Sequence, residues 1–246
     1  MKKGLSFLAA VAICFLCFFS CGEEQKDEEA LSLLRSSSEK WKEKDGYSSD
    51  FCMNMQAEGL DYTLLFAQGS YTVTSGKDFK RLDSKMSLVS LGSAAEVTSI
   101  WEDGVMTSVV AGNEVESEMT EDEVFSSMTY VKPFLPDEKY ISSCERLTTG
   151  AGSGCRVKLK NAVDILFPLV GNDIFELASI YSPRYDMTKI TDAEIIYTID
   201  GEDITGMKIT FTLTLYDTPP YVPGGDKPDA EEYSLTVKVS GNMEYR

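Results

Sequence analysis

Strict alternation of apolar and polar residues over the last third of the chain is the feature that most limits the possible folds. Apolar residues occupy every second position of 207–215 and 233–239, with threonine, serine and lysine between them. Ile195, Tyr197 and Ile199 show the same spacing in a preceding segment. Successive side chains of a strand point to opposite faces, so each of these strands has one buried and one wet face. This pattern is typical of an antiparallel sheet, because parallel strands are usually covered on both faces.

A period of two also appears earlier in the chain, interrupted by short turns. Residues 51–56 and 62–66 alternate in the same way, and a further alternating stretch contains Val97 and Trp101. The next apolar positions follow Asp103-Gly104, and an Asp-Gly pair between alternating runs is a strong hairpin signal. We therefore expect a hairpin at this pair. Extended segments are also expected near 138–147 and at 155–160, on either side of a glycine-rich turn that contains Gly150, Gly152 and Gly154.

Two helices are predicted by their spacing and their caps. Leu31, Leu34, Ser38 and Trp41 recur at helical spacing, which indicates an amphipathic helix from about residue 30 to near residue 46. The run Thr120-Glu121-Asp122-Glu123 has the form of a capping box, in which the threonine hydroxyl and the glutamate carboxylate each satisfy a free backbone amide. A short helix is expected from Glu121 to about residue 130, ending before Pro133.

Residues 162–181 differ from the rest because apolar side chains fall on nearly every side of the predicted helix. Asn161 can cap its start, and Pro168 and Gly171 should divide it into two pieces. A helix that is apolar all round is buried or covers something apolar. It is either a movable cap over an apolar cavity or a permanent part of a filled core. The candidate cavity or lid residues are Val163, Leu166, Phe167, Val170, Ile174, Leu177 and Tyr181.

The order of these elements predicts the α+β class. A long, strongly curved antiparallel sheet, open like a half-barrel and carrying helices on its concave side, would bury all the apolar faces. The length of 30–246 suits a single domain with a substantial core.

Three stretches carry a resemblance to a known family. LSLLRSSSEKWKEKDGYSSDFCMNMQ resembles the opening of LolA- and LppX-type lipoprotein carriers, and IWEDGVMTSVVAGNEVESEMTEDEV is similar to segments of uncharacterised Gram-positive lipoproteins. The closing run ITDAEIIYTIDGEDITGMKITFTLTLY also fits this pattern. The resemblance implies an open half-barrel with helices in its mouth and an apolar cavity for acyl chains. No ligand-binding residue of the family can be assigned to a position in this chain.

The N-terminus is typical of an export signal. Lys2 and Lys3 precede an uncharged apolar run that ends abruptly at Ser20-Cys21. A small residue directly before a cysteine resembles the site cleaved in bacterial lipoproteins, although Phe18 stands where such sites prefer Leu, Val or Ile. We expect residues 1–20 to be a signal peptide, Cys21 to carry acyl chains such as palmitate, and residues 21–29 to be an acidic tether. The alternative is an uncleaved signal anchor. Two acyl chains anchor a protein stably without a membrane-spanning helix.

Composition excludes several classes of function. Residues 1–20 hold two lysines and no acid, so the remaining chain has 21 basic and 40 acidic residues and a formal charge of −19. Such a charge repels nucleic acid and anionic head groups. The chain has no histidine, which removes Ser-His-Asp and Cys-His nucleophiles and histidine metal sites. We expect no enzyme activity, no cofactor and no metal.

Three thiols are left once Cys21 is acylated. In an exported protein this number means one disulfide plus a free thiol, or no disulfide. Cys144 and Cys155 flank the glycine-rich turn and could meet across neighbouring strands, so we predict a disulfide between them. Cys52 lies among alternating residues and is expected to remain a free thiol.

Two functions are compatible with this sequence. The first is an extracytoplasmic lipoprotein, held on the cell membrane by Cys21, that binds a lipid or another hydrophobic ligand in an apolar cavity. The second is a structural or protein-interaction lipoprotein whose core is filled by its own helices. Methionines such as Met53, Met55 and Met207 suit either, although we expect most of them to belong to the core. Extractable lipid in the purified protein would favour the first function.

Overall fold

The structure confirms the α+β class and the curved antiparallel sheet. The computed structural model describes residues 27–59, 63–75, 80–90, 93–127, 132–149, 152–167, 188–216 and 234–246. Their strands form one sheet in the order β6-β5-β4-β3-β2-β1-β11-β10-β9-β8-β7. The strands are β1 (Gly46–Ala57), β2 (Thr63–Ser75), β3 (Lys80–Ser90), β4 (Ser93–Glu102), β5 (Val105–Val110), β6 (Asn113–Glu118), β7 (Ile141–Thr149), β8 (Gly152–Leu159), β9 (Lys189–Asp200), β10 (Asp203–Tyr216) and β11 (Ser234–Tyr245).

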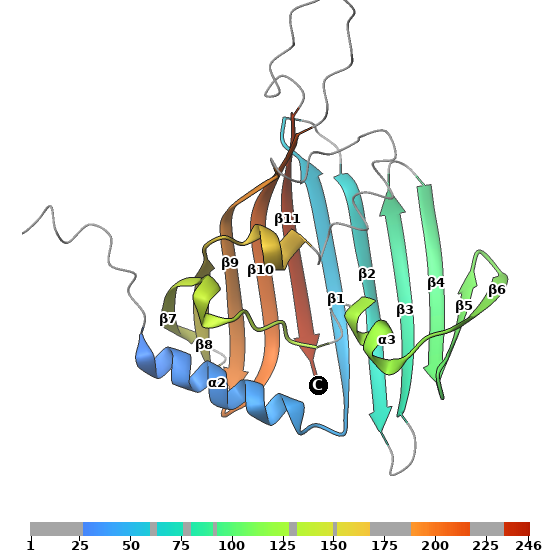
Figure 1. Cartoon of the computed structure of the whole chain (residues 1–246), viewed down its shortest axis with the longest axis horizontal. Coiled ribbons are helices and arrows are strands. Elements are labelled where there is room, and N and C mark those ends of the chain that lie inside the picture. The colour runs from blue at the N-terminus through green and yellow to red at the C-terminus, as the bar shows by residue number, and fades with distance from the viewer. Residues whose placement is uncertain are drawn as a thin grey trace, which may run out of the picture.

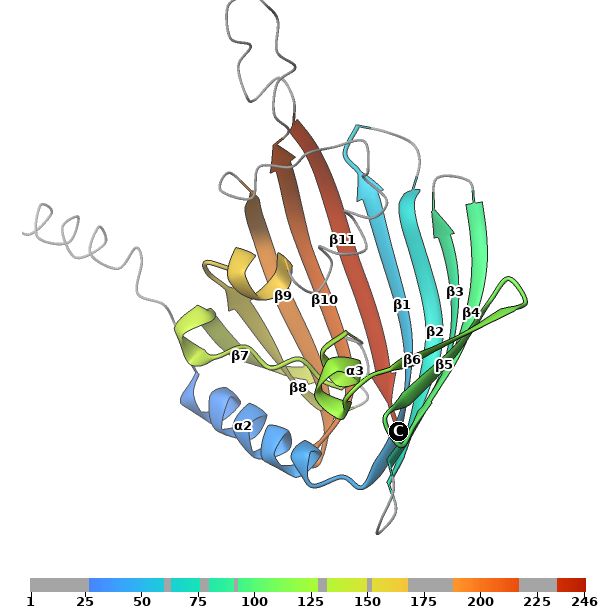
Figure 2. The ribbon, with the colours of Figure 1, turned by 45° about the vertical axis from the view of Figure 1, so that its right-hand side comes forward.

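The sheet consists of two antiparallel meanders joined in its middle. Strands β1 to β6 follow one another from the middle of the sheet to one edge, and β7 to β11 follow one another from the other edge back to the middle, where β11 pairs with β1. The sheet does not close, so β6 and β7 are its two edges. Figures 1 and 2 show that it curves around the helices, which lie on one side of it. This arrangement is the open half-barrel that the sequence predicts, and it agrees at the level of the fold with the resemblance to LolA- and LppX-type carriers.

The alternation of the sequence appears directly as alternating burial. In β10, Met207, Ile209 and Phe211 are buried on the concave face, and the residues between them are more exposed. Met53 and Met55 are also buried, which confirms them as part of the core. Each such side chain contributes about 1.5–3 kcal/mol by leaving water. The concave face therefore forms the core of the protein.

Gly69 is required by close packing rather than by its backbone angle. In register it lies opposite Phe51, whose ring stacks on Tyr71 with 5.2 Å between centroids. A Cβ at position 69 would lie 2.9 Å from Phe51 Cε1 and 2.2 Å from the Lys85 carbonyl oxygen. Only glycine leaves room for this aromatic pair in the middle of the sheet.

Helix α2 (Glu28–Lys42) packs against β7, β8 and β10. It begins two residues earlier than the sequence predicts, because Asp27 caps it by accepting hydrogen bonds from the amides of Glu29 and Ala30. The Asp27 amide in turn donates to the Cys144 carbonyl at 2.9 Å. The described chain thus enters the fold at Asp27, inside the segment expected to be a tether. The helix ends at Lys42, earlier than expected, because β1 begins at Gly46.

Helix α3 (Glu121–Ser127) confirms the predicted capping box. The Thr120 amide donates to Glu123 Oε2 at 2.7 Å, and the Glu123 amide donates to Thr120 Oγ1 at 3.3 Å. The preceding hairpin is also as predicted, because β4 and β5 are joined by Asp103 and Gly104, both at positive φ. Val124 is fully buried and holds α3 against the core.

The apolar segment 162–181 is only partly described. Residues 163–167 are helical, Leu166 is fully buried, and Val163 and Phe167 are half-buried. The predicted residues Val170, Ile174, Leu177 and Tyr181 lie outside the described residues. Among the described helices, none is long and apolar enough to cross a membrane.

Candidate functional site: a groove on the concave face

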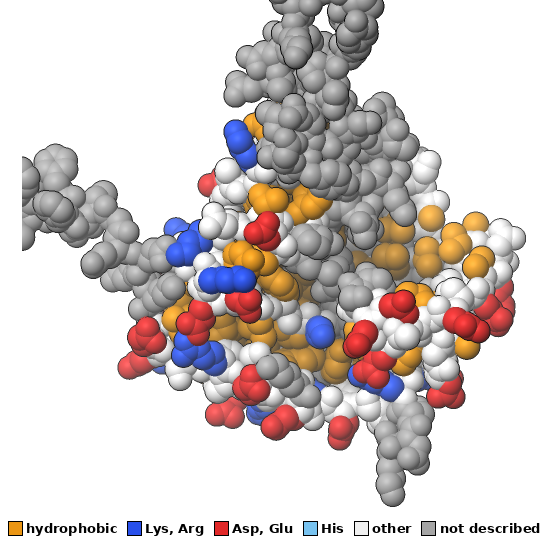
Figure 3. All heavy atoms as spheres, in the orientation of Figure 1, with side chains coloured by type: hydrophobic (Ala, Val, Ile, Leu, Met, Phe, Trp, Pro, Cys, Tyr) orange, Lys and Arg blue, Asp and Glu red, His pale blue; other side chains and the backbone are white. Residues whose placement is uncertain are grey.

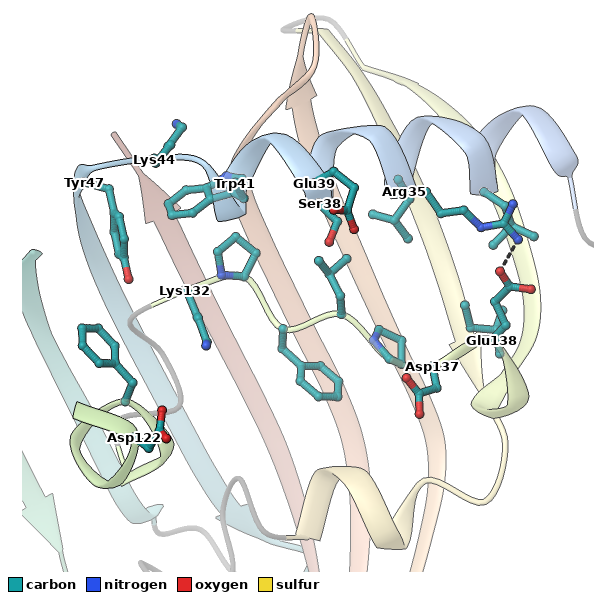
Figure 4. Close-up of a pocket in the computed structure, with 18 of the residues that line it drawn as sticks. Arg35, Ser38, Glu39, Trp41, Lys44, Tyr47, Asp122, Lys132, Asp137 and Glu138 are labelled. Carbon is teal, nitrogen blue, oxygen red and sulfur yellow. Dashed lines mark hydrogen bonds and ion pairs between the residues drawn. The ribbon is translucent and has the colours of Figure 1, made fainter. Parts of the chain in front are cut away.

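A groove of about 1080 Å³ lies on the concave face, between α2, α3 and the segment 132–138. We refer to residues 132–138 as the strap, because Figure 4 shows them crossing the sheet between the two helices. Small-molecule sites in proteins commonly have volumes of about 300–1000 Å³. The groove residues are Leu31, Leu34, Arg35, Ser38, Glu39, Trp41, Lys44, Tyr47, Lys80, Glu121, Asp122, Phe125, Lys132, Pro133, Phe134, Leu135, Pro136, Asp137, Glu138 and Ile141.

The strap forms one wall of the groove and is held by a buried side chain of the sheet. Pro133 and Pro136 lack amide hydrogens, so they suit an extended segment outside the sheet. Tyr197, which is 1% exposed, donates a 2.6 Å hydrogen bond to the Phe134 carbonyl. Burial raises the pKa of Tyr197 well above its ordinary value, so the hydroxyl stays protonated as the donor. This bond places Phe134 and Leu135 along the groove.

Trp41 anchors the opposite wall. Its indole Nε1 donates to the Ile204 carbonyl at 3.0 Å, which fixes the end of α2 on β10. The ring packs edge-on against Tyr47 and Tyr245, with centroids 4.8 and 5.1 Å apart. The tryptophan and the two tyrosines therefore form one rigid aromatic corner at this end of the groove.

Tyr47 presents an un-ionised hydroxyl to the groove. Burial, with a smaller contribution from the negative charge of Glu121, raises its pKa to about 12. Figure 4 shows the hydroxyl pointing away from Trp41 into the space between the helices. The phenol is thus available to donate a hydrogen bond to a bound group at neutral pH.

Three cations around the groove are paired with carboxylates. Arg35 forms an ion pair with Glu138, and Lys44 Nζ lies 3.4 Å from Asp203 Oδ1. Lys80 Nζ lies 2.5 Å from Glu121 Oε1 and 4.4 Å from the centroid of the Phe125 ring. These pairs join neighbouring elements at the rim, where solvent weakens each of them.

Apolar surface extends beyond the groove along the concave face of β3 to β6. Trp101 packs edge-on against Phe125 of the groove, with centroids 6.5 Å apart. In register with this part of the sheet, Val97 lies opposite Met86 and Val110. Met86 and Val97 are half-buried, whereas Val110 is 39% exposed. Figure 3 shows hydrophobic side chains both in the central hollow and over this half of the sheet.

The structure brings the two predicted disulfide residues together as free thiols. Cys144 faces Val157 and Cys155 faces Arg146, so the cysteines are diagonal neighbours on the buried face of the β7–β8 hairpin. Their mutual hydrogen bond and burial raise the pKa of Cys144, and the same bond lowers the pKa of Cys155. Cys155 also donates to the Ala30 carbonyl at 3.4 Å. The hairpin is confirmed, and the disulfide stays a prediction.

The remaining site predictions stand as follows. Cys21 lies outside the described residues, and Cys52 is a half-buried free thiol on β1. In the described part of the chain, no group of three or more cysteine, aspartate or glutamate side chains could hold a metal. The groove is not apparent from the sequence, since its walls come from segments far apart in the chain.

The fold of the chain is similar to that of solved structures. No family model matches the chain, and no curated protein matches it. The crystal structure of LprF from Mycobacterium bovis is similar over 88% of this chain and 93% of that chain, with 12% identity and a TM-score of 0.43. At this level of similarity no function transfers from LprF to this chain.

Proposed function

We propose that this chain is an extracytoplasmic lipoprotein that binds a lipid or another hydrophobic ligand in the concave-face groove. The observation that carries this proposal is the groove itself. It has room for a small ligand, and side chains such as Leu34, Phe134 and Leu135 line it. Half of its lining residues are apolar or aromatic and half are polar or charged, so the groove can hold a ligand that has both an apolar and a polar part.

The apolar surface that continues from the groove supports a ligand with a long chain. Phe125 lies at the groove, and Trp101, Val97 and Val110 follow it toward the edge of the sheet. An acyl chain placed along this path would cover partly exposed apolar side chains and gain the free energy of their burial. A compact polar ligand would leave that surface in water.

The membrane anchor of the proposed protein is Cys21. Its support is the abrupt end of the apolar run at Ser20-Cys21, and the acidic residues that follow separate the anchor from the domain. The domain would then lie close to the outer surface of a cell membrane. A ligand groove in that position has direct access to membrane lipids.

The deciding experiment is solvent extraction of lipid from the purified full-length protein, followed by mass spectrometry. Ser38→Trp places a bulky side chain in the groove, and Ser32→Trp makes the same change at an exposed position of α2 outside it. The proposal predicts bound lipid in the wild type and in Ser32→Trp, and reduced lipid in Ser38→Trp.

The competing function is a structural or protein-interaction lipoprotein without a small ligand. It would be supported if all three proteins yielded no lipid and added fatty acid or phospholipid failed to bind. Equal lipid in all three proteins would mean that the ligand site lies elsewhere on the molecule.

A further inference from the structure

Among the described residues that line the groove, one cation and one anion have no charged partner. Arg35, Lys44 and Lys80 each have a carboxylate partner, as described above. Asp137 lies 3.8 Å from Lys139 Nζ, and Glu39 is also engaged in an interaction.

Lys132 and Asp122 are left. Neither forms a hydrogen bond or an ion pair with any residue in the described part of the chain. Both are exposed groove residues, so water solvates both charges in the absence of a ligand. An opposite pair that remains open at a ligand site is available to a ligand that carries both signs of charge.

The two free charges lie at the same end of the groove. Figure 4 shows Lys132 at the start of the strap and Asp122 on α3, with Tyr47 beside them, whereas Arg35 and Glu138 lie at the other end. The Lys132 amine and the Tyr47 hydroxyl both point away from α2, toward the side of the strap on which α3 lies. Between them they offer one charged and one neutral donor, and Asp122 offers an acceptor.

The rest of the groove carries apolar side chains along both walls, beside polar residues such as Ser38 and the ion pair of Arg35 with Glu138. From this end, the walls continue through Pro133, Phe134 and Leu135 on one side and Leu34 and Leu31 on the other. A ligand with a polar end at Lys132 would therefore lay its apolar part against the strap and α2.

We infer that this end of the groove binds the head group of a zwitterionic phospholipid. The phosphate lies against Lys132 and the Tyr47 hydroxyl, and the ammonium lies against Asp122. This inference rests on the proposed function and names the ligand class of the same groove. A purely anionic head group would meet Asp122 and the neighbouring Glu121, and a purely cationic one would meet Lys132. The zwitterion satisfies both free charges at once.

The test compares three lipids that share one palmitoyl chain and differ in their polar end. They are lysophosphatidylethanolamine, lysophosphatidylglycerol and uncharged monopalmitoylglycerol, each titrated into the full-length protein. The wild type is expected to bind the zwitterion about tenfold more tightly than the uncharged lipid, as one charge-assisted contact would give. It should also prefer the zwitterion to the anionic lipid.

Two variants assign the contacts. Lys132→Met should weaken binding of both phospholipids and leave the uncharged lipid unaffected. Asp122→Asn should weaken binding of the zwitterion and leave the anionic lipid unchanged or bound more tightly. Lys208→Met and Asp200→Asn remove the same charges from exposed positions outside the groove, and should change nothing.

The outcomes separate this inference from the proposed function. Equal binding of all three lipids, unaffected by either groove variant, would overturn the head-group assignment and leave lipid binding in place. Preference for the anionic lipid in the wild type would also overturn it. Failure of all three lipids to bind would overturn the proposed function together with the assignment.

Discussion

The Tyr197 hydroxyl donates to the Phe134 carbonyl across 2.6 Å and thereby joins the middle of the sheet to the strap. It is the one described hydrogen bond between a sheet side chain and the wall of the groove formed by the strap. Because Tyr197 is buried, its position is fixed by the core. The shape of the groove therefore depends on core packing through the Tyr197 hydroxyl.

Tyr197→Phe should loosen the strap. Loss of this bond is expected to destabilise the protein by about 1 kcal/mol and to weaken ligand binding in the groove. Urea denaturation and lipid titration would measure the two effects. Tyr245→Phe is the matched control, because the Tyr245 hydroxyl is buried and has no hydrogen-bond partner among the described residues, so its removal should cost little. Equal effects of the two substitutions would contradict the assigned role of the bond.

Gly69→Ala should be strongly destabilising. The added methyl group would overlap the Lys85 carbonyl oxygen, which belongs to the backbone and cannot move without disturbing the β2–β3 ladder. We expect a loss of about 1–3 kcal/mol, as for other overpacked sites. Gly206→Ala provides the comparison, since a Cβ at position 206 would lie 3.4 Å from the nearest atom, the Met243 carbonyl oxygen. Thermal denaturation that ranked Gly206→Ala as the more harmful change would contradict this packing.

Thr120→Ala should destabilise α3 by about 1 kcal/mol through loss of the capping box. Hydrogen bonds from Thr120 hold the pKa of Glu123 below its ordinary value in the folded protein. A carboxyl group with a lowered folded pKa stabilises the protein above its unfolded pKa, and this contribution disappears as the pH falls through the folded pKa. The backbone amide of residue 120 makes the larger contribution and is kept by alanine, so NMR titration should show the pKa of Glu123 rising only part of the way toward the ordinary value in Thr120→Ala. An unchanged pKa of Glu123 would mean that the threonine hydroxyl does not lower it.

Cys144 and Cys155 are expected to form a disulfide when the protein matures in an oxidising compartment. Closing this short loop would add about 3 kcal/mol in the chain-entropy model. Mass spectrometry after alkylation under non-reducing conditions should find Cys52 modified and the other two cysteines linked. Alkylation of all three cysteines in the mature, unfolded protein would show that the pair stays reduced, as two buried hydrogen-bonded thiols.

Cys21→Ser should release the protein from membranes or leave its precursor uncut. Lipid attached at Cys21 is the expected anchor, so serine removes the only proposed attachment. Cell fractionation with an antibody against the domain would measure the distribution, and Cys52→Ser would control for loss of a thiol. A mature-sized Cys21→Ser protein that stays on the membrane would show that Cys21 is not the anchor.

The sheet could be predicted because the signals for its strands and turns lie between residues that are close in the sequence. Alternation at Met207, Ile209 and Phe211 places one face in the core whatever strand lies beside it, and Asp103-Gly104 encodes its own turn. The capping box at Thr120 is equally local, since its two hydrogen bonds join residues three apart.

The groove could not be predicted in this way. Tyr47, Lys132 and Leu34 come from a strand, the strap and a helix that meet only in the folded chain. Pro133 predicts the end of a helix, and a second proline at 136 with Phe134 and Leu135 between them indicates an extended apolar segment outside the sheet. That signal predicts a covering segment, but it does not show which residues lie beneath it.

The open edge at β6 would matter if the proposed anchor holds many copies of the protein on one membrane. Its exposed backbone could pair with the same edge of another molecule and start a growing sheet, a risk that rises when proteins are confined to a surface. Glu114, Glu116 and Glu118 alternate along this strand, and all of its residues are exposed. Two such edges brought together would set carboxylate against carboxylate, which disfavours pairing. The acidity of this strand therefore protects an unclosed sheet from self-association while its concave face remains open.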